Sequence, residues 1–193
     1  DILSLVVTIA VAFAVTAISG KWFIPFLRKL KYGQTILEDG PVWHKSKQGT
    51  PTMGGMMFIV GSVLAALVGA ATMGINESAT TSLNQLHLYA GLAMSIGFGA
   101  LGCADDYVKV VKKQNLGLTA KQKMAGQLLI SAAYLAVLYI GGATSTILHI
   151  PFIGQLDIGL LYYPFAMFVI VGTVNAVNLT DGIDGLCSSV TFV

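Results

Sequence analysis

Five apolar runs, each about 20 residues long, constrain the fold of this sequence more than any other feature. None of them contains Asp, Glu, Lys or Arg, and they cover residues 2–20, 53–74, 86–104, 124–143 and 158–179. A helix of about 20 apolar residues is long enough to cross the hydrocarbon core of a bilayer. The sequence therefore predicts an all-α polytopic membrane protein with five complete transmembrane helices, and a sixth apolar run starts at Leu186.

The composition agrees with a membrane protein and excludes several other classes. Only 10% of the 193 residues are charged, whereas about 25% is usual in a soluble domain. The chain has no basic block suited to nucleic acid and no G-x-x-x-x-G-K-[ST] phosphate loop. Cys103 and Cys187 have no further Cys or His at zinc-ligand spacing, so we expect two small buried side chains.

The basic residues predict how the spans are oriented. All 11 lysines and arginines lie in two segments, six between Lys21 and Lys47 and five between Lys109 and Lys123. Because basic residues gather in cytoplasmic loops, we expect both segments in the cytoplasm and the N-terminus outside. We treat 1–193 as a single, incomplete transmembrane domain. Its predicted cytoplasmic segments are about 21–52, 105–123 and 180–186.

The segments between the spans carry weaker signals. Mixed aromatic and basic residues in 21–31 predict an interfacial extension of the first helix. Turn residues and alternating apolar residues in 144–157 predict a short hairpin on the membrane surface. Lysines and arginines beside spans are usually topological anchors. We expect this role for Lys21, Arg28, Lys29, Lys31, Lys121 and Lys123.

Polar residues gather at the predicted cytoplasmic ends of the spans. The clusters are Lys45, Lys47, Thr50 and Thr52; Asp105 and Asp106; and Asn178, Asp181 and Asp184. Asp105 and Asp106 would point about 100° apart on a helix, so one could bind a metal ion while the other faces a lysine or another group. Mg²⁺ prefers one or two carboxylates together with phosphate oxygens and water. Helix capping is the plainer explanation for the last cluster.

Glycines beside the last acids predict a break in the helix. Gly182 and Gly185 flank Asp184, and a broken helix exposes backbone N–H groups that can bind phosphate oxygens. His44 lies beside Lys45 and could contact phosphate, although a single histidine is weak support. His87 and His149 fall at the opposite face and are expected to be interfacial.

Three groups of residues together resemble a known family. They are Asp39-Gly40-Pro41 with His44 and Gly49-Thr50-Pro51-Thr52-Met53-Gly54-Gly55; Asp105-Asp106-Tyr107; and the stretch Asn175-Ala176-Val177-Asn178-Leu179-Thr180-Asp181-Gly182-Ile183-Asp184-Gly185-Leu186. In this order they resemble the polyprenyl-phosphate N-acetylhexosamine-1-phosphate transferases. Within that superfamily, the Pro-Thr-Met-Gly-Gly and Asn-Leu-Thr-Asp-Gly forms resemble the bacterial phospho-N-acetylmuramoyl-pentapeptide-transferase branch.

The resemblance implies a reaction and its reactants. Phospho-N-acetylmuramoyl-pentapeptide would pass from its UDP carrier to undecaprenyl phosphate, giving lipid I and UMP with Mg²⁺ as cofactor. It implies a bacterial plasma-membrane protein of about ten helices with a cytoplasmic active site. The partners are then UDP-N-acetylmuramoyl-pentapeptide, undecaprenyl phosphate and membrane lipid, without nucleic acid; a homodimer is a candidate assembly.

The resemblance also implies roles for individual residues. Asp105, Asp106 and Asp181 correspond to catalytic positions, and Asp105 and Asp106 are also candidate metal ligands. The residues implied to bind substrate are His44, Lys47, Thr52, Asn175, Asn178, Gly182, Ile183 and Asp184. The family's main metal ligand, a third catalytic Asp, is expected beyond Val193, so residues 1–193 alone are expected to be inactive.

Two other classes of function fit the composition. A cation-coupled transporter would also place acids at broken helices, but it would carry polar residues near mid-span and inverted repeats, which this sequence lacks. A membrane assembly subunit would carry the same polar clusters only as loops. A related amino-sugar substrate is a further alternative.

Overall fold

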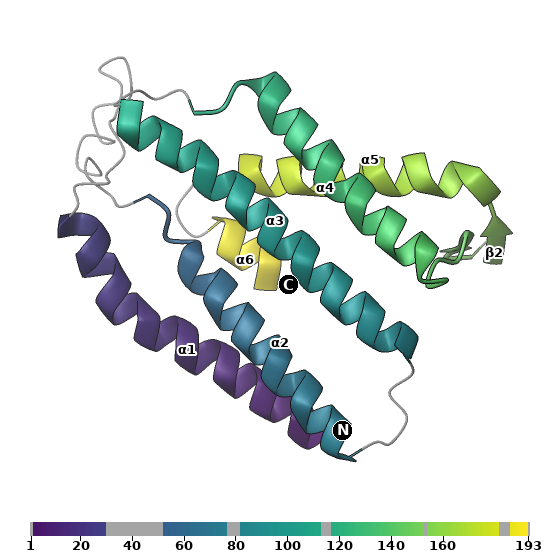
Figure 1. Cartoon of the computed structure of the whole chain (residues 1–193), viewed down its shortest axis with the longest axis horizontal. Helices are drawn as coiled ribbons and strands as arrows, with labels where there is room; N and C mark the ends of the chain where they lie inside the picture. The colour runs from purple at the N-terminus through teal and green to yellow at the C-terminus, as the bar shows by residue number, and fades with distance from the viewer. Residues whose placement is uncertain are drawn as a thin grey trace. The chain divides into compact units, whose positions relative to one another are not determined.

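The computed structural model describes residues 2–29, 52–76, 82–112, 117–152, 154–181 and 186–192, and most of them are helical (Figure 1). The chain divides into two compact units, Asp1–Lys123 and Met124–Val193. The first unit contains α1 (Ile2–Lys29), α2 (Met56–Asn76), α3 (Ser82–Lys112) and the first turn of α4 (Ala120–Ile140). The second contains the rest of α4, β1 (Ile147–Ile150), β2 (Gly154–Asp157), η2 (Gly159–Leu161), α5 (Tyr162–Thr180) and α6 (Leu186–Phe192).

Four of the described helices are long and apolar enough to cross a membrane, namely α1, α3, α4, and α5 with η2. The apolar part of α2, Met56–Thr72, is shorter. The mostly helical structure is compatible with the predicted polytopic membrane protein, and a helix lies on each of the five predicted runs. Large apolar side chains such as Phe13, Trp22 and Phe168 are exposed, as expected for helices that face lipid.

Several helix boundaries differ from the apolar runs. The predicted interfacial extension is continuous with α1, which runs to Lys29. α2 starts at Met56 and not at Met53 because Met53 adopts a left-handed backbone with φ 67°. α3 continues past Asp105 and Asp106 to Lys112, so the two acids end the apolar run but not the helix. The first charged residue after an apolar run therefore shows where the predicted span ends, but the helix can continue beyond it.

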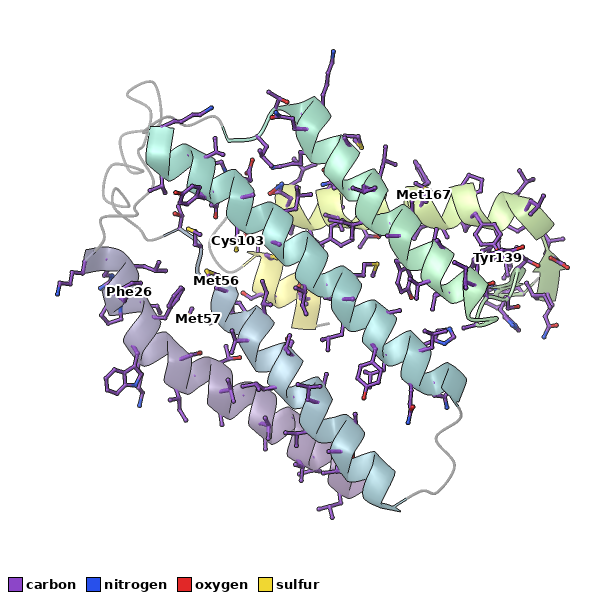
Figure 2. The ribbon with its side chains drawn as sticks, viewed as in Figure 1. Phe26, Met56, Met57, Cys103, Tyr139 and Met167 are labelled. Atoms are coloured by element: carbon purple, nitrogen blue, oxygen red, sulfur yellow. The ribbon has the colours of Figure 1, made fainter. Side chains whose placement is uncertain are left out.

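α1 and α2 lie side by side in the first unit (Figure 1). A methyl group added to Gly69 would lie 2.6 Å from the Thr8 Oγ1, and one added to Gly61 would collide with the Thr16 hydroxyl. Small residues allow this close approach between helices in a membrane. Near the start of α2, the Met57 Sδ would lie 3.5 Å from a methyl group on Gly20 of α1 (Figure 2).

A buried hydroxyl pair joins the same two helices. Ser4 is only 1% exposed, and its Oγ lies 2.7 Å from the Thr72 Oγ1. The Ser4 hydroxyl also donates to the Gly69 carbonyl at 3.4 Å. Because a buried hydroxyl without a partner would destabilise the fold, these contacts explain how Ser4 is accommodated between apolar helices.

Glycine ends α4 in the second unit. Gly142 has φ 65°, its N–H donates to the Tyr139 carbonyl, and the Ala143 N–H donates to the Leu138 carbonyl. This pair of bonds is a Schellman motif, which needs a residue that tolerates a left-handed backbone. Nearby, the rings of Tyr139 and Tyr163 meet edge to face with centroids 5.7 Å apart (Figure 2).

The predicted hairpin is confirmed as β1 and β2. The strands are antiparallel, with Ile147 opposite Asp157 and Ile150 opposite Gly154. The Asp157 carboxylate accepts a hydrogen bond from the Thr146 hydroxyl at 2.6 Å and another from the Gly159 N–H at 2.9 Å. These two bonds hold the pKa of the Asp157 carboxyl below its usual range. The bond from Gly159 also connects the hairpin to η2, which leads into α5 (Figure 1).

α5 accommodates a proline because of its position. Pro164 is the third residue of the helix, and the first-turn N–H groups have no partner within a helix, so the missing proline N–H removes no bond. The helix ends at Thr180, and the Asp181 N–H donates to the Val177 carbonyl at 3.1 Å. α5 therefore ends two residues before Gly182, and the glycines of the predicted break lie outside the described residues.

Candidate active site

The acid pair lies on α3, just after Cys103 (Figure 2). Adjacent residues of a helix point about 100° apart, and the two carboxylates accordingly have different surroundings. Asp105 is only 5% exposed, whereas the Asp106 side chain is 30% exposed. One acid is therefore a buried group, and the other is accessible from outside the chain.

The buried charge of Asp105 is matched by two lysines and a backbone amide. Its Oδ2 lies 2.8 Å from the Lys109 Nζ and 3.2 Å from the Lys123 Nζ. Its Oδ1 accepts a hydrogen bond from the Leu118 N–H at 2.8 Å. Since an unpaired carboxylate would be costly at this depth, these three partners explain why Asp105 can be buried.

Gly117 allows the segment before α4 to pass close to Asp105. A methyl group added to Gly117 would lie 2.7 Å from both the Asp105 Cγ and the Asp105 backbone oxygen. Any side chain at this position would push the segment away and break the bond from Leu118. No sequence pattern singled out Gly117 or Leu118 as site residues, and Lys123 was expected only to anchor a span.

Asp106 is joined to the segment that precedes α2. Its Oδ2 accepts a hydrogen bond from the Met53 N–H at 3.3 Å, and its Oδ1 accepts one from the Lys109 Nζ at 3.1 Å. A left-handed backbone is uncommon for residues other than glycine. Met53 adopts this conformation while its N–H donates to Asp106. Thr52, a predicted substrate-binding residue, is half-buried and directly precedes Met53 in the sequence.

Lys109 bridges the two acids. It lies four residues after Asp105 and three after Asp106, which is the spacing of ion pairs on one helix face, and the structure contains both pairs. This lysine could have been found from sequence if α3 had been extended past the acids. Lys123 was expected to be only a topological anchor, and that expectation is wrong because Lys123 pairs with Asp105.

The acid pair is a poor metal site by itself. Among the described residues, no three His, Cys, Asp or Glu side chains lie close enough to hold a metal ion. Asp105 is buried, and its two oxygens already have three partners in Lys109, Lys123 and the Leu118 N–H, so it has little capacity left for a cation. Asp106 accepts one bond on each oxygen and is more exposed, so of the pair only Asp106 fits a metal ligand.

The third predicted polar cluster, which contains Asn178 and Asp181, lies at the end of α5. Asn178 and Asp181 are exposed there, whereas Asn175 is half-buried and bonded to Gln127 of α4 through both amide groups. A carboxylate at a helix C-terminus opposes the helix dipole, at a cost of about 0.3–1 kcal/mol. Asp181 is therefore placed where it does not stabilise α5, which favours a functional role for it.

Five predicted site residues fall outside the described residues. These are His44, Lys47, Gly182, Ile183 and Asp184.

The comparison with known families decides the class of the chain. Residues 88–193 match the family described as glycosyl transferase family 4. The chain belongs to glycosyl transferase family 4. The residues matched to this family contain Asp105, Asp106, Lys109, Lys123, Asn175 and Asp181.

The glycosyl transferase family 4 chain is also similar to curated proteins named phospho-N-acetylmuramoyl-pentapeptide-transferase. It is 48% identical to the one from Heliobacterium modesticaldum over 94% of this chain and 53% of that protein. It is 47% identical to the one from Listeria monocytogenes serotype 4b (strain CLIP80459), over 98% of this chain and 56% of that protein. A Geobacillus kaustophilus protein of the same name is 47% identical over 95% and 54%. The chain thus spans about half the length of the curated relatives it matches.

Proposed function

We propose that the protein containing this chain transfers phospho-N-acetylmuramoyl-pentapeptide from its UDP carrier to undecaprenyl phosphate, which gives lipid I and UMP. The observation that carries the proposal is the 48% identity, over 94% of the chain, to a protein named for that transfer. Membership of a transferase family favours an enzyme over a transporter or an assembly subunit.

The proposed topology places the acid pair at the cytoplasmic face of a bacterial plasma membrane. In it, α1 to α5 each cross the bilayer, with α2 included, and the whole protein has about ten spans. The clustering of all basic residues in two segments supports this orientation. A site at the ends of spans suits a reaction between a lipid and a soluble nucleotide, and a homodimer is the proposed assembly.

The reaction joins two anions, so charge has to be screened. An oxygen of the lipid phosphate attacks the phosphorus that carries the sugar, a new P–O–P bond forms, and the bond to the UMP oxygen breaks. Catalysis of phosphoryl transfer rests mainly on positioning and electrostatic stabilisation. Lys109 and Lys123 would supply positive charge beside the phosphates, as their positions around Asp105 support.

The two acids are proposed to act differently. Asp106 is accessible and has remaining acceptor capacity, so we assign it the contact with the reactants. Asp105 is buried and bonded on both oxygens, so we assign it the task of holding the lysines in place. Asp181 is the third proposed catalytic residue.

Mg²⁺ is the proposed cofactor. It would screen the diphosphate and polarise the phosphorus under attack. Asp106 is the described carboxylate that fits it, and the main ligand is proposed to lie outside 1–193, which leaves this segment inactive by itself. The proposed contacts of the nucleotide and its sugar are His44, Lys47, Thr52, Asn178, Gly182, Ile183 and Asp184.

The proposal is tested with the full-length protein in detergent or nanodiscs. Radiolabelled UDP-N-acetylmuramoyl-pentapeptide is incubated with undecaprenyl phosphate, with Mg²⁺ or with a chelator, and lipid-linked label is counted. We expect label in the lipid fraction only with Mg²⁺. Radiolabelled UDP-N-acetylglucosamine is tested as a second donor. Transfer from this donor alone would indicate a related amino-sugar transferase, and no transfer from either donor would reject the proposal.

A further inference from the structure

One face of α4 buries two polar side chains among apolar ones. Gln127 is 3% exposed and Ser131 is 0% exposed, and Leu135 and Leu138 continue the buried face. The Ser131 hydroxyl donates to the Gln127 carbonyl of its own helix at 2.8 Å. The Gln127 side chain instead reaches another helix, and this makes it the unusual member of the face.

Gln127 and Asn175 form a reciprocal pair of amides. The Asn175 Nδ2 donates to the Gln127 Oε1 at 2.8 Å, and the Gln127 Nε2 donates to the Asn175 Oδ1 at 3.3 Å. The Asn175 Nδ2 also donates to the Val171 carbonyl at 2.8 Å. Because a carbonyl can only accept, that third bond fixes which end of the Asn175 amide is nitrogen, and hence the orientation of both amides.

The side chain of Asn175 makes three hydrogen bonds within the chain. Both of its N–H donors and its oxygen are engaged within the chain. A substrate would have to displace a buried bond to reach it, and the partner left unpaired would carry a desolvation penalty. Asn175 is therefore better suited to hold a helix than to bind a nucleotide.

We infer that Gln127 is a positioning residue for the transferase site, acting through Asn175. The pair fixes the last turns of α5 against α4, three residues before Asn178 and six before Asp181. Two side chains proposed to contact the reactants thus take their position from the hydrogen bonds between Gln127 and Asn175. The inference rests on the proposed function and adds a residue that the acidic motifs do not contain.

The experiment exchanges the two side chains in the full-length protein. The variants are Gln127→Asn, Asn175→Gln and the exchanged double variant, with Ser131→Ala as the control on the same face of α4. Transfer to undecaprenyl phosphate is measured well below the lowest unfolding temperature of the set and expressed per folded enzyme. The values of kcat and of KM for the UDP donor are determined separately, because a pair that only stabilised the fold would leave kcat per folded enzyme unchanged.

Each single variant should lower kcat at least about tenfold, since small displacements of catalytic groups cost this much or more. The exchanged double variant again pairs one longer and one shorter amide side chain, with their positions swapped, so its kcat should recover to within about threefold of wild type. The kcat of Ser131→Ala should remain near wild type. Single variants with wild-type kcat would overturn the inference. So would an exchanged variant with a raised KM and no recovery, because that result means that Asn175 touches the substrate. A wild-type protein without transfer would instead reject the proposed function, and this role with it.

Discussion

Asp105 combines a full negative charge with 5% exposure, and at the scale of single residues its partners explain how the site is held. Two lysines and one backbone N–H surround the carboxylate. These partners come from α3, from α4 and from the segment between them. Removing one partner should lower the free energy of unfolding by more than the loss of a contact, because it leaves part of the buried charge of Asp105 without compensation.

The first prediction concerns Lys123. Lys123→Met keeps the length of the side chain but removes its charge, so Asp105 keeps only Lys109 and the Leu118 amide. We expect the free energy of unfolding to fall by about 1–3 kcal/mol, measured by thermal unfolding in one detergent. Lys121→Met is the matched control because Lys121 is exposed on the same helix, and it should change by less than about 0.5 kcal/mol. Equal losses from both variants would contradict the role of Lys123.

Gly117 gives a second prediction at this scale. A methyl group at this position would lie 2.7 Å from the Asp105 Cγ, so Gly117→Ala should displace the segment and cost about 1–3 kcal/mol. Gly91→Ala on α3 is the control, because nothing lies within 4 Å of the added methyl group. Alanine is the better helix former by about 1 kcal/mol, so the control should be as stable as wild type or more stable. A stable Gly117→Ala variant would refute the close approach.

At the scale of elements, the packing of α1 on α2 depends on the absence of side chains at glycine. Gly61→Ala should collide with the Thr16 hydroxyl and destabilise the protein by about 1–3 kcal/mol. Adding Thr16→Ala removes that hydroxyl, and the nearest remaining atom of residue 16 would then be its Cβ at 3.5 Å. The double variant should therefore regain most of the stability in thermal unfolding. Additive losses would show that the two helices do not meet at this point.

The hairpin before α5 gives a prediction about pH. The pKa of Asp157 lies below its usual range because the carboxylate accepts bonds from Thr146 and Gly159. A group whose pKa is lowered by folding stabilises the fold above its unfolded pKa, and this contribution is lost as the pH falls through the folded pKa. Carboxyl chemical shifts in an NMR titration should therefore change at lower pH for Asp157 than for an exposed aspartate. Thr146→Val should raise the Asp157 midpoint, and an unchanged midpoint would contradict the assignment.

At the scale of the whole molecule, apolar runs and charge predicted a membrane protein and the position of each long helix among the described residues. They could not predict where helices continue through polar residues. α3 passes Asp105 because hydrogen bonding along a helix does not depend on side-chain charge, and Lys109 continues the pattern by pairing with both acids. The start of α2 was missed by three residues because a left-handed Met53 leaves no composition signal.

The candidate site was predicted only in part, for a related reason. The acids stood out because carboxylates are rare beside apolar runs. Lys123 and Leu118 did not stand out, because their role comes from contacts with Asp105 of α3, 18 and 13 positions away in the sequence. Gln127 likewise lies 48 positions from its partner, and no local pattern could connect the two amides. Contacts between elements are therefore what the sequence could not supply.

Asp106, the accessible acid of the pair, is proposed to serve the transferase site. The most direct test is the rate of transfer from UDP-N-acetylmuramoyl-pentapeptide to undecaprenyl phosphate by the full-length Asp106→Asn variant. Asparagine keeps one oxygen that can accept from the Met53 N–H, and Lys109 keeps its pairing with Asp105. Thermal stability should therefore remain near wild type, whereas the rate should fall by about 10²-fold or more. A variant that transfers at the wild-type rate, with the same folded yield, would contradict the account.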